Sequence, residues 1–534
     1  MSISRRTVLH WASLAAAASI SVSSTACDDG EPEPAAPVVG PPPTLAEPLP
    51  SEPASRALFV HGVASGDPLT DRIILWTRIT PPAGAAGVEG TWVVATDPAL
   101  NKVVGSGAFT TDAAADFTVH VDATGLAPAT TYFYRFLALG GSSPVGRTRT
   151  APAGAVARLR FAVVSCSSLA HGYFHAYRAL ATQPDLDAVL HLGDYIYEYG
   201  TNEYGSVRAY EPATEIVSLE DYRTRFAQYR RDADLQSLHQ QHPMIAVWDD
   251  HEVADNGWRE GASGHDADEG VWADRQVAAK RAYFEWMPVR TQPSGQLWRS
   301  FRYGDLVDLL MLDTRYAGRD EQVAVNSGLF NEPGRTLLGS EQEAWIKDQL
   351  ATSKARWRLI GQQVVLGTTP SLLAGDAWTG YGAARDKLFD AIEGAPAGNV
   401  IVLTGDIHSS WVTELARDVA TYDAATGKGA VAVELVAPAV SSPGAGKSAP
   451  TAVILAKEAN PGIRYLDFVN RGFLLLDVTP ERAQADFFHY PDPEPEQTAV
   501  VFASAWSIAS GQARATEQGA PVAPGAGAAL APAV

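Results

Sequence analysis

The chain has 534 residues and a formal net charge of −20, and this length suggests two to four domains. The charge excludes a protein that wraps nucleic acid, because no surplus of basic side chains remains to neutralise phosphates. An anionic ligand would have to be attracted by local positive charge, such as that of bound metal ions.

The first 27 residues have the features of an export signal. Ser4-Arg5-Arg6-Thr7-Val8-Leu9 matches a twin-arginine signature, and an apolar stretch from Trp11 to Val22 is too short for a comfortable membrane span. We therefore expect export of the folded protein by the twin-arginine (Tat) machinery to the periplasm or beyond. A chance Arg-Arg before an ordinary export signal is the alternative. Ser24-Thr25-Ala26-Cys27 resembles a lipoprotein cleavage site, whose use would place a lipid anchor on Cys27.

The next two segments differ sharply in composition. Residues 28–56 are rich in Pro, Ala and Glu without periodicity, which predicts a disordered linker. Residues 57–152 contain short strand-like segments, including a turn followed by an alternating aromatic strand at 125–136. This pattern predicts an N-terminal immunoglobulin- or fibronectin-like β-sandwich.

From residue 157 to residue 505, short apolar runs alternate with amphipathic stretches, which predicts an α/β domain. Helices are predicted after the N-cap Ser218, from Val277 to Met287, and from a capping box at Ser340-Glu341-Gln342-Glu343. Residues 472–490 are typical of a hairpin. The Ala-, Pro- and Gly-rich tail 511–534 predicts disorder. The apolar runs lie at 159–164, 188–190, 244–247, 306–312 and 400–403.

Four of the predicted strands end in unusual polar clusters. In a parallel sheet the carboxyl ends of the strands share one edge, where open α/β sheets bind their ligands. So many ionisable groups at one edge would repel one another unless cations held them together. We therefore predict a metal site, and two metal ions would use the number of ligands best. The clusters are Ser165-Cys166-Ser167-Ser168, Gly193-Asp194 with Tyr197, Trp248-Asp249-Asp250-His251-Glu252, and Thr404-Gly405-Asp406-Ile407-His408.

The order of these motifs resembles that of the calcineurin-like metallophosphoesterases, which carry Gly-Asp-x-x-Tyr, Gly-Asn-His-Asp/Glu and Gly-His-x-His blocks. Cys166, Asp250 and Asp406 stand where most of them have Asp, Asn and His. These replacements are typical of one branch, the PhoD-like alkaline phosphatases, which the segments Val63–Pro68, Leu75–Arg78 and Asp313–Arg315 also resemble. The resemblance covers residues from about 58 to 505 and implies a metallophosphoesterase core of two sheets flanked by helices.

The resemblance also implies a mixed metal centre. Cys166, Asp194, Tyr197 and His408 would hold Fe(III), because thiolate and phenolate are anionic ligands that suit a trivalent ion. Asp194 would bridge to Ca(II), with Asp250 and Asp406 adding the oxygen ligands that calcium prefers. Zn(II) or Mn(II) is the alternative second metal. Gln363 stands where other metallophosphoesterases supply a further His.

The activity implied by the resemblance is hydrolysis of phosphomonoesters, phosphodiesters or both, by a hydroxide formed when cations lower the pKa of a water. We expect His251 to contact phosphate or to protonate the leaving oxygen. Arg315 is a candidate phosphate clamp, with a structural ion pair to Asp313 as the alternative. A phosphodiesterase or phospholipase D-type enzyme acting on cell-wall polymers or phospholipids is the second candidate, and a non-catalytic surface-binding protein a remote third. The loops 200–217 and 319–336 are candidate covers of the metals, and the oligomeric state stays open.

Overall fold

The structure is a computed structural model that describes residues 53–533, except 293, 331, 372, 396–398, 447 and 448. The predicted export signal 1–27, with Cys27, and the linker up to residue 52 lie outside the described residues. The end of the predicted linker forms helix α1 (Pro53–Leu58). Within the described ranges, no helix has the length and apolarity needed to cross a membrane.

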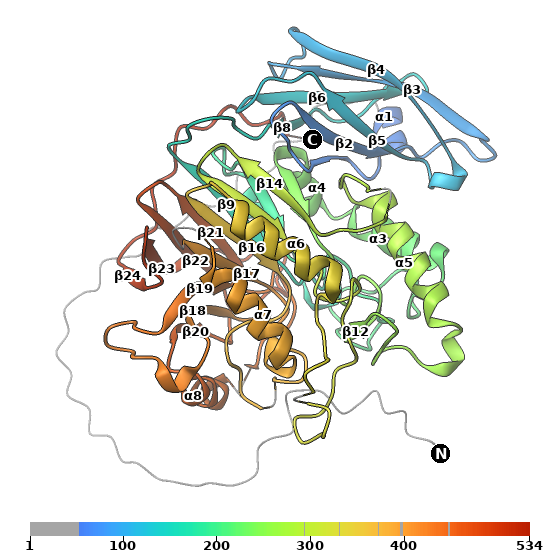
Figure 1. Ribbon diagram of the computed structural model, residues 1–534. Helices are drawn as coiled ribbons and strands as arrows, with labels where there is room; N and C mark the ends of the chain where they lie inside the picture. The colour runs from blue at the N-terminus through green and yellow to red at the C-terminus, as the bar shows by residue number, and fades with distance from the viewer. Residues whose placement is uncertain are drawn as a thin grey trace, which may run out of the picture.

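Two large β-sheets pack face to face, with helices on their outer sides (Figure 1). In the first sheet the strands follow the order β24 (Ala515–Gln518), β23 (Val501–Ala509), β22 (Arg482–Tyr490), β21 (Arg471–Val478), β9 (Leu159–Val164), β10 (Ala188–His191), β11 (Pro243–Ala246), β1 (Val63–Gly66), β2 (Arg72–Arg78) and β5 (Thr118–Thr124). In the second they follow the order β14 (Arg299–Tyr303), β15 (Val307–Met311), β16 (Trp357–Gln362), β17 (Val400–Thr404), β19 (Ala430–Val436), β18 (Ser410–Ala416) and β20 (Ile463–Asp467).

The predicted α/β core is present, and its parallel strands lie at the centre of each sheet. β9, β10 and β11 are parallel neighbours in the first sheet, as are β15, β16, β17 and β19 in the second. Leu309 and Leu359 pack between the sheets, whereas the adjacent Leu310 and Ile360 pack toward α6 and α7. Burial on both faces explains why these strands are continuous apolar runs in the sequence.

The helices cover the outer faces of the two sheets and mostly agree with the sequence. Ser218 is the N-cap of α3, as predicted, and it forms a capping box with Asp221. The predicted capping box at Ser340 is wrong, because α6 begins one residue earlier and its first N–H, that of Gly339, donates to the Thr336 hydroxyl. The helices are α2 (His175–Ala181), α3 (Leu219–Tyr229), α4 (Ala233–Gln241), α5 (Trp272–Trp286), α6 (Gly339–Thr352), α7 (Gly382–Glu393) and α8 (Ala449–Ala459).

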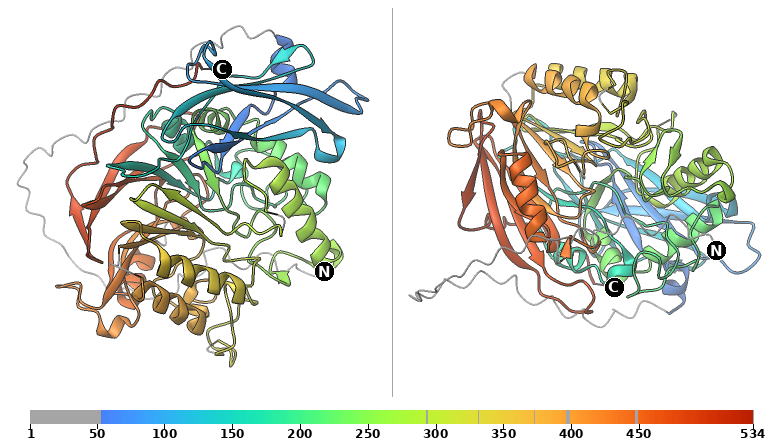
Figure 2. Two further views of the ribbon diagram at one scale, coloured as in Figure 1. Left: turned by 45° about the horizontal axis from the view of Figure 1, so that its top comes forward. Right: turned by 90° about the horizontal axis from the view of Figure 1, so that it is seen from below.

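The N-terminal β-sandwich is present, but one of its two layers belongs to the first large sheet. β1, β2 and β5 extend that sheet beyond β11, and their Leu75 and Val121 pack in one core cluster with Tyr134 of a separate layer. The sandwich therefore shares its backbone hydrogen bonding with the α/β core (Figure 2). The separate layer consists of β4 (Val103–Asp112), β3 (Gly87–Ala95), β6 (Thr131–Ala138), β7 (Gly141–Ser142) and β8 (Gly146–Arg149). A small hairpin, β12 (Gly257–Trp258) and β13 (Gly261–Ala262), lies apart from these sheets.

The prediction of a disordered tail is wrong for residues 511–533. β24 adds a strand to the first sheet, and the chain then returns to the N-terminal sandwich, where the C-terminus lies (Figure 1). The Gly525 N–H donates to Asp185 at 2.6 Å and the Ala531 N–H to Gln241 at 2.8 Å. The composition of the tail was misleading, because the tail has few large apolar side chains to bury. Its backbone N–H groups are instead bound by polar side chains of the folded core.

Candidate metal centre

The predicted ligands lie where the two sheets meet, and not at the edge of a single sheet. Cys166 follows β9 and Asp194 follows β10 in the first sheet, whereas Asp406 and His408 follow β17 in the second. A parallel bridge between Ser165 and Ala439 joins the sheets at this point. Strand ends from both sheets therefore face one site.

Four of these side chains stand on strained backbone. The φ angles of Cys166, Asp194, Asp406 and His408 are 61°, 56°, 64° and 52°, in the left-handed region that non-glycine residues rarely adopt. Such strain costs about 1–3 kcal/mol per residue and persists where the surroundings fix it, most often at functional sites. Its recurrence at four predicted ligands supports a shared function.

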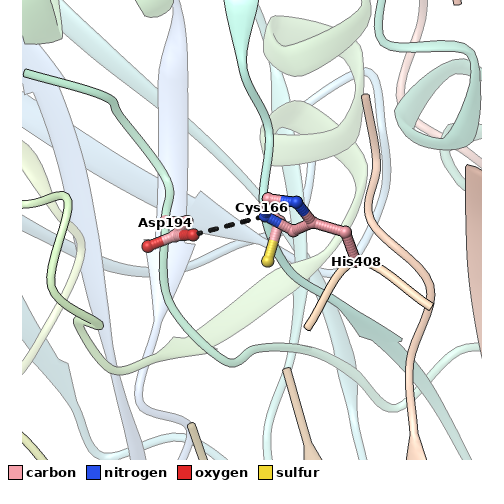
Figure 3. Close-up of side chains that lie close together, drawn as sticks. All are labelled: Cys166, Asp194 and His408. Carbon is pink, nitrogen blue, oxygen red and sulfur yellow. Dashed lines mark ion pairs between the residues drawn. The ribbon is translucent and has the colours of Figure 1, made fainter. Parts of the chain in front are cut away.

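The first ligand group is Cys166, Asp194 and His408, whose ligand atoms lie within 4.8 Å of one another (Figure 3). Asp194 Oδ2 is 4.0 Å from His408 Nε2. Asp194 Oδ1 is buried and has no hydrogen-bond partner among the described residues. A buried carboxylate oxygen without a donor is costly, and a cation at this point would satisfy it.

Tyr197 and His408 are oriented toward the same group. The Tyr197 hydroxyl donates to Asp194 Oδ2 at 2.9 Å and accepts from the Ser442 hydroxyl at 2.6 Å. His408 Nδ1 is 3.0 Å from the Pro443 carbonyl, so this nitrogen carries the proton and donates. Nε2 is then the nitrogen that faces the Tyr197 hydroxyl at 3.3 Å and Asp194, an arrangement typical of metal-ligating histidines.

The second ligand group is Asp249, Asp250 and Asp406, and it provides only carboxylate oxygens. A third group consists of Asp194, Asp250 and His251. It shares Asp194 with the first group and Asp250 with the second, so the three groups adjoin one another. Burial, reinforced by neighbouring carboxylates, raises the pKa of Asp406 and Asp249 well above the ordinary value. Burial and then Asp194 likewise raise the pKa of the Cys166 thiol. Bound cations would lower these pKa values, so the donor sets fit metal ions.

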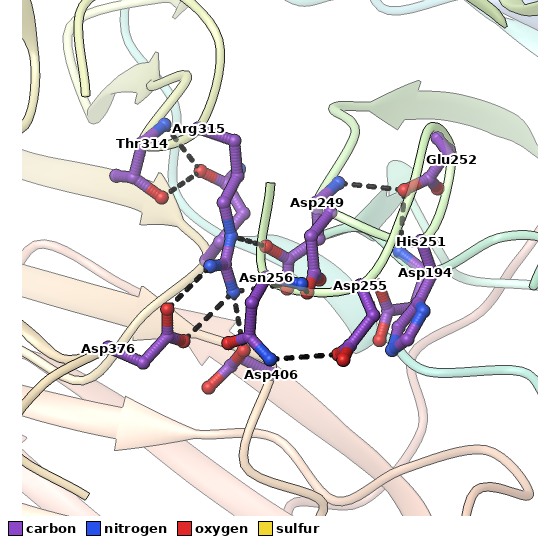
Figure 4. Close-up of polar contacts among 12 residues, drawn as sticks. Asp194, Asp249, His251, Glu252, Asp255, Asn256, Thr314, Arg315, Asp376 and Asp406 are labelled. Atoms are coloured by element: carbon purple, nitrogen blue, oxygen red, sulfur yellow. Dashed lines mark hydrogen bonds and ion pairs between the residues drawn. The ribbon is translucent and has the colours of Figure 1, made fainter. Parts of the chain in front are cut away.

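Arg315 lies among the carboxylates, and neither role predicted for it is supported by its contacts. Its Nη1 donates to Asp376 at 2.7 Å and its Nη2 to Asp406 at 2.7 Å, while Nε donates to Asp249 at 2.5 Å (Figure 4). The Asp313 carboxylate instead accepts the backbone N–H of Arg315 at 2.9 Å. A fully buried guanidinium bound in this way positions carboxylates, because aspartates accept four hydrogen bonds from its five N–H donors.

Gln363 is not a metal ligand in this arrangement, contrary to the expectation from the resemblance. Its Oε1 accepts from the Thr314 N–H at 2.8 Å and from the Thr314 hydroxyl at 2.6 Å. Its Nε2 donates to the Leu312 carbonyl at 3.0 Å. Both polar atoms of the amide therefore hold the turn after β15.

His251 is held by an acidic partner that the sequence did not indicate. Its Nδ1 is 2.8 Å from the Glu198 carboxylate, which also accepts the Asp255 N–H at 2.7 Å. Burial opposes the charged form of His251, but the carboxylates of Glu198 and Asp250 outweigh burial and hold its pKa well above the ordinary value. Glu198 therefore favours the protonated form of His251, which can donate a proton or a hydrogen bond.

Two further acidic residues organise the site and were missed. Glu252 accepts the N–H groups of Asp194, Tyr195 and Asp249 and so joins the turns after β10 and β11. It stands in the Asp-Asp-His-Glu motif, which was the signal that could have revealed it. Asp376 accepts from Arg315, Arg319 and Gln322, and it stands in a loop without any recognisable motif.

Comparison with known proteins gives consistent matches over most of the chain. A family model described as PhoD-like phosphatase matches residues 161–487, and one described as PhoD-like phosphatase, N-terminal domain, matches residues 44–152. Alkaline phosphatase D of Bacillus subtilis (strain 168) is 41% identical over 460 residues, which cover 80% of this chain and 77% of the relative. A solved structure described as "Structure of PhoD" superposes with a TM-score of 0.80 at 36% identity, covering 87% of this chain and 93% of that one.

Proposed function

The chain belongs to the PhoD-like phosphatase family and is a phosphoric ester hydrolase, and we propose that it is an exported enzyme that uses Fe(III) and Ca(II). The observation that carries the metal proposal is the pair of adjoining donor sets. One set combines a thiol, a carboxylate and an imidazole, and the other provides carboxylates only. The first suits a trivalent iron and the second suits calcium, which prefers oxygen ligands.

Cys166, Asp194, Tyr197 and His408 would hold the iron. Asp250 and Asp406 of the carboxylate-only group would hold the calcium together with Asp194, while Asp249 of that group accepts from Arg315. Bound cations would supply positive charge for the phosphoryl oxygens and lower the pKa of a water molecule. Zn(II) or Mn(II) at the second position is the alternative. The carboxylate-only donor set disfavours Zn(II), whereas Mn(II) also accepts oxygen ligands.

The chain's own residues orient these groups and move a proton. Glu198 fixes the His251 ring and favours its protonated form, so His251 can donate to the leaving oxygen. Glu252 holds the turns that carry Asp194 and Asp249 through their backbone N–H groups. Arg315 sets the positions of Asp249 and Asp406. The predicted Tat signal and the predicted lipid anchor at Cys27 support export as part of this proposal.

The test is elemental analysis of the exported protein together with hydrolysis of p-nitrophenyl phosphate and bis-p-nitrophenyl phosphate at alkaline pH. We expect iron near one per chain and turnover that depends on calcium. The ratio of the two rates decides between a phosphomonoesterase and a phosphodiesterase. Zinc or manganese in place of iron would contradict the metal assignment, and a metal-free, inactive protein would support the surface-binding alternative.

Replacement of the thiol tests the iron ligands directly. In Cys166→Ser we expect loss or a marked shift of the visible charge-transfer band, because serine lacks the sulfur orbitals that give rise to it. Asp250→Asn is the matched control, since it changes the calcium side and should leave the band in place. An unchanged spectrum in Cys166→Ser would rule out thiolate ligation of iron.

A further inference from the structure

The loop of residues 200–217 places Tyr204 against the metal centre. The Tyr204 ring stacks on Tyr197 with centroids 5.3 Å apart and an interplanar angle of 18°. It also stacks on His251 at 6.1 Å and on Tyr199 at 4.8 Å. One wall of the site is therefore an aromatic stack that includes a predicted iron ligand and the predicted proton donor.

The backbone that follows Tyr204, residues 205–208, is held by contacts with neighbouring segments. The Val207 N–H donates to the Ala170 carbonyl at 2.8 Å, and Arg208 forms an ion pair with Asp232 at 2.6 Å. Gly205 packs so closely that a Cβ there would lie 2.7 Å from the Ala170 oxygen. The loop position is thus set before any ligand binds, which lowers the entropic cost of using Tyr204 in binding.

The hydroxyls of Tyr197 and Tyr204 differ in one respect. The Tyr197 hydroxyl is used by Asp194 and Ser442. The Tyr204 hydroxyl makes no hydrogen bond to any residue that the structure describes, and it is not among the fully enclosed polar atoms. The Tyr204 ring stacks on Tyr197 and on His251, so its phenol lies at the wall of the site.

We propose that Tyr204 contacts the substrate, its phenolic hydroxyl donating a hydrogen bond to the phosphoryl group while its ring supports Tyr197 and His251. A neutral O–H suits this task, because it binds an anionic oxygen without adding a charge that the cations would repel. The Tyr204 side chain is partly exposed, so a substrate can reach it. This inference rests on the proposed phosphoesterase activity.

Tyr204→Phe separates the two parts of the role, because it keeps the ring and removes only the hydroxyl. We expect kcat/KM for p-nitrophenyl phosphate to fall about tenfold or more, the range for a hydrogen bond to a charged group. The inhibition constant of inorganic phosphate should rise in parallel. The iron content and the charge-transfer band should stay as in the parent protein. Tyr204→Ala should in addition shift the band, because Tyr197 loses its stacking partner.

Tyr465→Phe on β20 is the matched control, since the Tyr465 ring packs on Phe487 and Trp506, outside the aromatic stack of the site. We expect it to leave the phosphate inhibition constant within twofold of the parent. Parental kcat/KM and phosphate inhibition in Tyr204→Phe would overturn the inference, as would a loss accompanied by altered iron content. An inactive parent protein would instead overturn the proposed function itself.

Discussion

Asp194→Asn should reduce kcat/KM by roughly three orders of magnitude, because a lost bridging carboxylate weakens both cation sites and with them several kcal/mol of transition-state stabilisation. The protein should still fold. Asn tolerates the left-handed backbone at this position (φ 56°) better than other side chains, and its amide oxygen can still accept the Tyr197 hydroxyl. The measurements are kcat/KM, metal content and the melting temperature Tm.

Asp486→Asn is the matched control for this variant. Asp486 is a buried carboxylate on β22 that accepts from Gln484 and Val522. Burial raises its pKa to about 6, so the site favours the charged form less than water does, and the amide oxygen of Asn can still accept one of the two hydrogen bonds. We expect parental activity in Asp486→Asn. Parental activity in Asp194→Asn would contradict the bridging role, and an unfolded Asp194→Asn protein would contradict the prediction that the backbone accommodates Asn.

The sequence predicted the site residues that directly follow the apolar strands. The motifs after β9, β10, β11 and β17 converge, because buried parallel strands bring their carboxyl ends together and each end carries its ligands within six residues. The apolar segments of the sequence could not show that these strand ends come from two sheets and not from one. An apolar strand looks the same in either sheet when both of its faces are buried.

Residues whose role depends on long-range partners could not be predicted in this way. Asp376 is 61 positions from Arg315, and no local pattern connects them. Gln363 was assigned by analogy of position, but its amide is used by Thr314 and Leu312. The prediction of a disordered tail was wrong because the tail is held by Asp185 and Gln241, which its own composition cannot show.

Because the N-terminal sandwich continues the first large sheet, the two predicted domains share structure. Ser65 and Gly66 of β1 pair in parallel with Pro243 and Met244 of β11. β11 leads directly to Asp249 and Asp250, so strand pairing with the sandwich supports the strand that carries these carboxylates. The sandwich is thus part of the framework of the site, as well as a module that precedes it in the sequence.

The second large effect should come from Arg315→Met, which we expect to lower the free energy of unfolding by about 3–5 kcal/mol, the usual cost of removing one partner from a buried ion pair. The guanidinium is fully buried and contacts Asp249, Asp376 and Asp406, with Asp250 at 3.5 Å. Among the described residues, the one other guanidinium that contacts any of these carboxylates is that of Arg319, which pairs with Asp376. The measurement is Tm with calcium and with a chelator, and the loss should be larger with the chelator because calcium offsets part of the repulsion.

Arg302→Met is the control, because the Arg302 side chain is 71% exposed although it also pairs with an aspartate, Asp308, at 3.1 Å. An exposed pair of this kind contributes about 0–1 kcal/mol, so Tm should barely change. The same two variants also decide between a positioning residue and a phosphate clamp. A clamp would raise the inhibition constant of phosphate and leave Tm unchanged, whereas a positioning residue lowers Tm and metal affinity together. A stable Arg315→Met protein with selectively weakened phosphate binding would therefore restore the clamp and overturn the structural role.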